Sequence, residues 1–147
     1  MEAKALETMD APQSGDLRIG DLSLRFLVTH PGATVFERVI PSGARVPAPH
    51  YHRDVDETLY GLSGALSVIV DGTTHLLQPG DAFFIPRGAV HQHENKHAED
   101  ARFLAVLTPG TIGRAYFEEI AQIINAPGRP DMAQVKAVML RHGLQPV

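Results

Sequence analysis

Short apolar segments separated by turn residues run through most of this 147-residue chain. The alternation of Leu22, Leu24, Phe26 and Val28 places apolar side chains on one face of an extended strand. Further strands are predicted at residues 34–40, 58–62, 65–70, 74–77, 82–85, 89–93 and 102–107. Asp-Gly pairs such as the one between the strands at 65–70 and 74–77 are strong hairpin signals. Closely spaced strands with such turns predict a β-sandwich or β-barrel and argue against βαβ units.

The period of the apolar residues changes after Pro109-Gly110. Apolar residues at helical spacing predict one helix that ends at residue 124, and a second that begins with Asp131 as N-cap and ends at Gly143. Each helix has a single apolar face, so we expect both to pack as a cover on the outer face of a sheet. The chain is expected to form one domain with three parts: an N-terminal arm or edge-strand lead-in (1–20), a β-barrel (21–108) and a C-terminal helical extension packed on the barrel (109–147).

The composition limits the classes of function. The formal net charge of −4 argues against a general nucleic-acid surface. No apolar run approaches the roughly 20 residues of a membrane span, and the first residues contain no apolar signal segment, so we expect a cytoplasmic protein that does not enter a membrane. Because the chain has no cysteine, any metal must be bound by histidine and carboxylate side chains.

Two groups of potential metal ligands occur in the central part of the chain. His50 and His52 are two residues apart, so they point to the same face of a strand, and Glu57 joins them if the chain bends in between. His91 would have to come from a strand that is distant in sequence but adjacent in a closed barrel. Three imidazoles and one carboxylate suit divalent iron, manganese, nickel, copper or zinc and leave coordination positions open for substrate or water. A closed structural zinc site would more often use cysteines.

The spacing within these groups resembles the two sequence motifs of cupins, G-x5-H-x-H-x(3,4)-E-x6-G and G-x5-P-x-G-x2-H-x3-N. The second motif is matched at every fixed position, by Gly80, Pro86, Gly88, His91 and Asn95. The first is matched by His50, His52, Glu57 and Gly64, whereas the preceding glycine, Gly43, lies one residue too far from His50. The chain thus resembles a small single-domain cupin of the cupin 2 type. This resemblance implies an all-β double-stranded β-helix, a jelly-roll barrel, with two short C-terminal helices, and a homodimer.

The resemblance also implies roles for individual residues. The metal ligands would be His50, His52, Glu57 and His91. Glu57 would be catalytic as well, because it could accept a proton from the substrate. His93 shares the parity of His91, so it is either a substrate contact or a satisfied core histidine, and Leu59 shares the parity of Glu57 and is expected to form an apolar wall of the substrate site. Asn95 is interpreted as a hydrogen-bonding residue at the end of a strand.

Because one fold supports many reactions, the function has to be argued from the site. The pattern is similar to that of quercetin dioxygenase-like cupins, which implies a metal-dependent dioxygenase-type oxidoreductase that acts on a small oxygen-rich molecule. Two alternatives stay open: a metal-assisted isomerase or lyase acting on a sugar or keto acid, and a non-catalytic cupin that binds a small molecule. A barrel that keeps its histidines without a metal is the fourth interpretation.

Overall fold

The computed structural model describes residues 16–46 and 48–147, and these form eleven strands and two helices. The strands are β1 (Leu17–Ile19), β2 (Leu22–His30), β3 (Ala33–Ile40), β4 (His50–His52), β5 (Asp56–Ser63), β6 (Leu66–Val70), β7 (Thr73–Leu77), β8 (Ala82–Ile85), β9 (His91–Glu94), β10 (Ala101–Thr108) and β11 (Leu144–Pro146). The helices are α1 (Arg114–Ile124) and α2 (Met132–Arg141). Every strand and helix predicted from the sequence is present, with boundaries that differ by a few residues.

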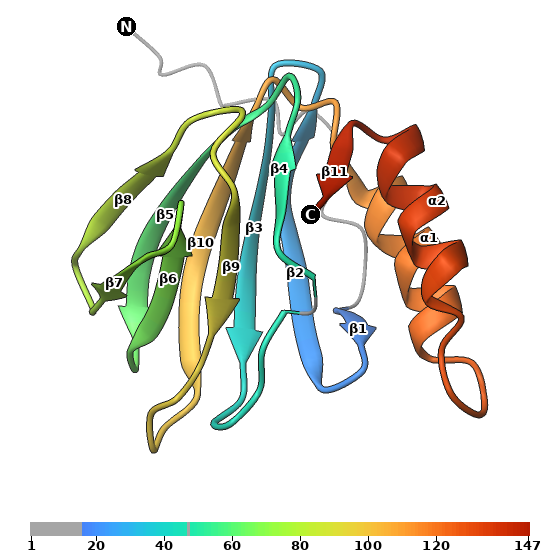
Figure 1. Cartoon of the computed structure of the whole chain (residues 1–147). Coiled ribbons are helices and arrows are strands. Elements are labelled where there is room, and N and C mark those ends of the chain that lie inside the picture. The colour runs from blue at the N-terminus through green and yellow to red at the C-terminus, as the bar shows by residue number, and fades with distance from the viewer. Residues whose placement is uncertain (1–15, 47) are drawn as a thin grey trace, which may run out of the picture.

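The strands form two antiparallel sheets that face each other (Figure 1). The six-stranded sheet has the order β1-β2-β3-β10-β5-β8, and the five-stranded sheet has the order β11-β4-β9-β6-β7. Buried and more exposed residues alternate along β3 and β10, as expected for strands with one face toward a core. This arrangement is the predicted double-stranded β-helix, mainly β with two short helices.

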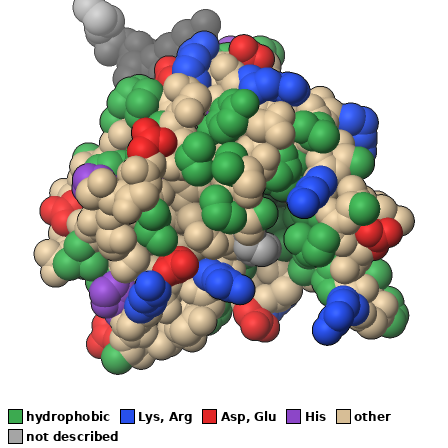
Figure 2. Space-filling view, viewed as in Figure 1, with side chains coloured by type: hydrophobic (Ala, Val, Ile, Leu, Met, Phe, Trp, Pro, Cys, Tyr) green, Lys and Arg blue, Asp and Glu red, His purple; other side chains and the backbone are tan. Residues whose placement is uncertain are grey.

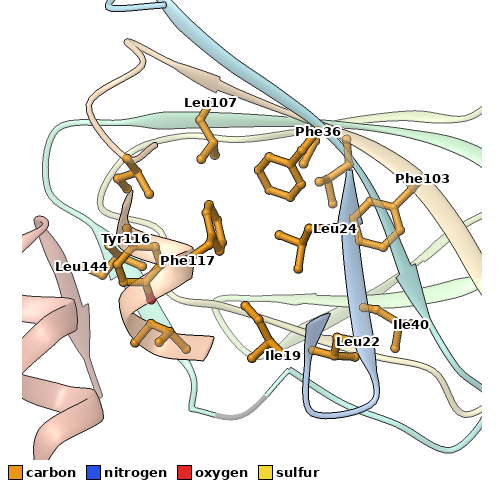
Figure 3. Packing of buried hydrophobic residues seen from close by; sticks show 14 of the residues in the cluster. Ile19, Leu22, Leu24, Phe36, Ile40, Phe103, Leu107, Tyr116, Phe117 and Leu144 are labelled. Atoms are coloured by element: carbon orange, nitrogen blue, oxygen red, sulfur yellow. The ribbon is translucent and has the colours of Figure 1, made fainter. Parts of the chain in front are cut away.

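The hydrophobic core lies between the two sheets and continues under α1. Leu24, Phe36 and Phe103 are almost completely buried inside the barrel. Phe117 of α1 points toward Phe36 (Figure 3), and the centroids of the two rings are 5.1 Å apart. Phe26 extends this cluster, with ring centroids 5.6 Å from Phe36 and 5.7 Å from Phe117. The apolar face of α1 is therefore part of the barrel core.

The position of the helices differs from the prediction. They do not cover the outer face of a sheet, because α1 packs beside the edge strand β1 and α2 packs beside β11 (Figure 1). The helices thus close the side of the barrel where both sheets have an edge. The predicted N-cap is confirmed, because the Asp131 side chain accepts hydrogen bonds from the backbone N–H groups of Ala133 and Gln134.

Both ends of the described chain add a short strand. Leu17–Ile19 form the edge strand β1, which corresponds to the lead-in expected within residues 1–20, and the rest of that predicted arm, residues 1–15, lies outside the described residues. The predicted helical extension is corrected by β11, which pairs with β4 and joins the barrel. Neither helix in the described part of the chain is long and apolar enough to cross a membrane.

Candidate metal centre

Both sheets contribute side chains to the candidate metal centre. His50 and His52 lie on β4, and His91 lies on β9 directly opposite His50. Glu57 lies on β5 of the other sheet, where alternate residues point inward. Residues far apart in sequence are thus brought together between the sheets, as the motif spacing predicted.

The turn between β8 and β9 fixes the position of the strand that carries His91. Gly88 has a φ of 84°, in the left-handed region that glycine adopts readily, and its N–H donates to the carbonyl of His52 at 2.8 Å. Arg87 donates to both carboxylate oxygens of Asp56, with Nε to Oδ1 and NH2 to Oδ2 each 3.1 Å. These contacts connect the turn before His91 with the residue that precedes Glu57.

Backbone carbonyls orient two of the imidazoles. Nδ1 of His50 donates to the carbonyl of Ala48, and Nδ1 of His91 donates to that of Ala89, each at 3.0 Å. Such bonds leave Nε2 directed toward the centre, as is usual for metal-bound histidines. Nε2 of His50 lies 3.3 Å from Nε2 of His52, and Nε2 of His91 lies 3.1 Å from Oε2 of Glu57.

The donor atoms form two overlapping groups that share His91. One group contains His50, His52 and His91, and the other contains Glu57, His91 and His93, with all donor atoms of a group within 4.8 Å of one another. The structure therefore brings together the four predicted ligands and adds His93 beside them. The ligand role of each side chain remains a prediction.

Burial determines the charge of the imidazoles. It lowers the pKa of His50 to about 4, with a further contribution from the neighbouring His91, and it also lowers the pKa of His52. Burial is the largest influence on Glu57 and opposes its ionisation, but the hydrogen bond with His91 and the charges of the neighbouring histidines together hold the pKa of the carboxyl below its ordinary value. Burial is also the largest influence on His91, but the hydrogen bond and the charge of Glu57, together with the backbone carbonyl of Ala89, raise its pKa. At neutral pH, the imidazoles of His50 and His52 are therefore uncharged and lie near the ionised carboxylate of Glu57.

This donor set fits a divalent transition metal. Because His50 donates its Nδ1 proton to a carbonyl, its Nε2 presents a lone pair toward the centre, 3.3 Å from Nε2 of His52. A cation would satisfy this lone pair, and it would replace the proton that His91 and Glu57 share. Neutral imidazole and carboxylate are the forms in which these side chains bind iron, manganese, nickel, copper or zinc.

A cavity of about 310 Å³ opens from the candidate centre toward the helices. Its lining includes all four predicted ligands and His93, together with apolar residues of the sheets, α1 and α2. Hydrophobic side chains gather around a hollow between the strands and the helices (Figure 2). Together, the buried donors and this cavity form a site that a small molecule can enter.

The other two predicted contacts have different positions. His93 is 4% exposed and lines the cavity, and neither of its ring nitrogens has a hydrogen-bond partner among the described residues. Leu59 points inward on β5 with the same parity as Glu57, but it is completely buried in the core and is not among the described residues that line the cavity. The parity of a residue predicts which face of the strand its side chain points to. The cavity reaches only part of the inward face of β5, so parity alone could not show whether Leu59 lines it.

Arg38 is a site residue that the sequence interpretation missed. It lies on β3, is 7% exposed and lines the cavity. The sequence contained a signal for it, because Phe36, Arg38 and Ile40 share one face of the strand and the two flanking residues are apolar. An arginine at a core-facing position calls for a functional explanation.

A family model and several curated relatives match this chain. The model of the Cupin domain matches residues 36–107. Protein SchB of Streptomyces halstedii is 32% identical over 95 residues, which cover 63% of this chain and 68% of SchB. Quercetin 2,3-dioxygenase of Bacillus subtilis is 34% identical over 70 residues, which cover 48% of this chain and 20% of the dioxygenase.

A solved structure also resembles this chain. A cupin-superfamily sugar phosphate isomerase from Silicibacter pomeroyi aligns with a TM-score of 0.56 and 29% identity, covering 61% of this chain and 60% of that one. This chain spans about half the length, or less, of three of its curated relatives. The region matched by the Cupin domain model, residues 36–107, contains all four predicted ligands.

Proposed function

Because this chain belongs to the cupin family, we propose that it is a metal-dependent dioxygenase-type oxidoreductase acting on a small oxygen-rich molecule. The metal ligands in this proposal are His50, His52, Glu57 and His91. The observation that carries the proposal is the convergence of three imidazoles and a carboxylate at an apolar cavity of about 310 Å³. The similarity to quercetin 2,3-dioxygenase supports the reaction type.

The residues of the site have separate tasks in the proposed reaction. When bound, a metal ion would supply redox chemistry for a substrate with an enolate or hydroxy-ketone oxygen. His50, His52, Glu57 and His91 would hold this ion, and the backbone carbonyls of Ala48 and Ala89 orient the rings of His50 and His91. The carboxylate of Glu57 would accept a proton from an acidic, enolic hydroxyl of the substrate. Apolar walls exclude water from the reacting groups.

Oxygen uptake tests the reaction type. The protein is loaded separately with iron, manganese, nickel or copper and supplied with flavonol and diketone substrates. We expect oxygen uptake with at least one metal, no uptake with zinc, and a loss of uptake in Glu57→Gln. No uptake with any of these metals, or only zinc in the purified protein, would count against a dioxygenase.

A metal-assisted isomerase or lyase is the second candidate. The structural similarity to the sugar phosphate isomerase favours this candidate. In such a reaction the metal would act as a Lewis acid, so no oxygen would be consumed. Turnover of a sugar or keto acid under anaerobic conditions would support this candidate and exclude the dioxygenase. A co-purified small molecule that is recovered unchanged would instead support a non-catalytic binding protein.

The predicted homodimer also belongs to this proposal. Large apolar side chains are exposed on the outer face of β5 and β8, where Tyr60, Leu62 and Phe84 are 44%, 37% and 56% exposed. Such a surface is suitable for contact with a second copy of the chain. Sedimentation equilibrium should show a dimer that is weakened by Phe84→Ser, and a monomer at all concentrations would contradict the prediction.

A further inference from the structure

Arg38 is a buried cation in apolar surroundings. On β3 it lies opposite Leu24 of β2 and Phe103 of β10, which are both almost completely buried. Phe36 and Ile40, two residues before and after it, point to the same face and are buried as well. The guanidinium therefore extends from an apolar strand face into the cavity that contains the candidate metal centre.

No side chain of the described residues neutralises this cation by direct contact. The ion pairs and hydrogen bonds formed by residues 16–46 and 48–147 do not include Arg38, and its buried Nε atom has no hydrogen-bond partner. Glu57 and Tyr116 influence it only through their electrostatic fields. Glu57 is engaged with His91 at 3.1 Å, so its charge belongs to the metal centre.

An arginine guanidinium remains charged in a protein and presents five N–H donors in a planar arrangement. Leaving such a group buried without an acceptor is strongly unfavourable. A ligand oxygen with negative charge would accept these hydrogen bonds. A carboxylate can accept the two parallel N–H donors of a guanidinium as a bidentate pair.

The rest of the cavity indicates what the anion is attached to. Phe36 and Leu107 line the cavity from the six-stranded sheet, and Tyr116 and Phe117 line it from α1 (Figure 3). Met139 of α2 lines it as well. Aromatic and aliphatic side chains of this kind bind flat apolar groups, and a volume of about 310 Å³ is that of a small-molecule site. Two other charged residues of the lining, Arg45 and Asp21, are exposed to solvent. The cavity thus combines an apolar chamber with the positive charge of the buried Arg38.

We propose that this site takes an apolar, ring-containing carboxylate, whose carboxylate group binds Arg38 and whose ring fills the chamber beneath α1. The proposal rests on the proposed function only in placing another oxygen of the same molecule at the metal centre. Arg38 is then the residue that determines specificity for an anionic substrate.

Binding of two matched probes tests this assignment. The probes are 2-naphthoate and its neutral analogue 2-naphthamide, and isothermal titration calorimetry gives their affinities for the protein as purified and again with chelator. We expect wild type to prefer naphthoate by about 10-fold or more, the effect of one charge-assisted hydrogen bond. Arg38→Met should abolish the preference, because it reduces the affinity for naphthoate much more than that for the amide, whereas Arg38→Lys should keep part of the preference.

The matched control is Arg25→Met, which removes an exposed arginine from the neighbouring strand β2 and should leave the preference intact. Equal affinity of wild type for the two probes would overturn the proposal, and so would an unchanged preference in Arg38→Met. The wild-type comparison decides the question even if Arg38→Met fails to fold. Because the readout is binding with and without chelator, a failure here is distinguishable from a failure of metal-dependent oxygen uptake.

Discussion

Acid should strongly destabilise the metal-free protein, prepared with chelator. Burial lowers the pKa of His50 to about 4 and that of His93 to about 3. In the unfolded chain both imidazoles titrate near about 6.5. Between these values the unfolded chain binds more protons than the folded protein, so the free energy of unfolding falls as the pH falls. Above the unfolded value, this contribution to stability is fully present.

The size of the effect follows from the shifts in pKa. Each pKa unit corresponds to about 1.4 kcal/mol, and a pH of about 5 lies roughly 1.5 units below the unfolded value and above both folded values. Each of the two histidines therefore accounts for a loss of about 2 kcal/mol between about pH 7.5 and about pH 5. His52, whose pKa burial also lowers, adds to this loss, whereas His91, whose pKa is raised, acts in the opposite direction.

Urea unfolding of the chelated protein, followed by circular dichroism at both pH values, measures this loss. His93→Leu should remove about 2 kcal/mol of the pH-dependent part, because the buried imidazole is no longer there to titrate. His30→Leu, which changes an exposed histidine on β2, should show the same loss as wild type. The reasoning is refuted if wild-type stability is equal at the two pH values, or if His93→Leu retains the full loss.

Three further predictions concern the scaffold. Asn95→Ala should lower the free energy of unfolding by about 2–4 kcal/mol in urea, because Nδ2 donates to two backbone carbonyls at 2.9 and 2.8 Å; a change below about 1 kcal/mol would contradict this. Phe117→Ala should lower it by about 3–5 kcal/mol, since it leaves a cavity beneath α1, and calorimetric unfolding should show a matching fall in melting temperature. Deleting residues 144–147 should weaken metal binding, because it removes β11, which pairs with the strand β4 that carries His50 and His52. Competition with a chelator measures this affinity, and an unchanged value would show that β11 does not position the ligands.

Several features of the site could be predicted because they depend on local geometry. His50 and His52 share a face through strand periodicity, and the motif spacing placed His91 opposite them. Asn95 was interpreted as a hydrogen-bonding residue, and it is almost completely buried, with its amide bonded to the carbonyls of Ile40 and Glu99. Predictions of this kind need only the direction of a side chain and the order of the strands.

Other features depend on distant parts of the chain and were missed. β11 has three residues, too few to show a periodic pattern, and its pairing with β4 fixes where the helices lie. Leu59 and Arg38 both face inward, but the sequence does not reveal which one the cavity reaches. The shape of the cavity depends on how α1 packs against β1, and this packing decides that the cavity reaches Arg38 and not Leu59.

Elemental analysis of protein purified without chelator tests the proposed metal centre most directly. We expect about one divalent transition metal ion per wild-type chain and none in His52→Ala, whose circular dichroism spectrum should stay that of the β fold, because the core consists of the apolar strand faces. A collapsed spectrum in this variant would mean that the metal is structural. Full metal content in His52→Ala, or a wild-type protein that binds no metal even after reloading, would contradict the proposed centre.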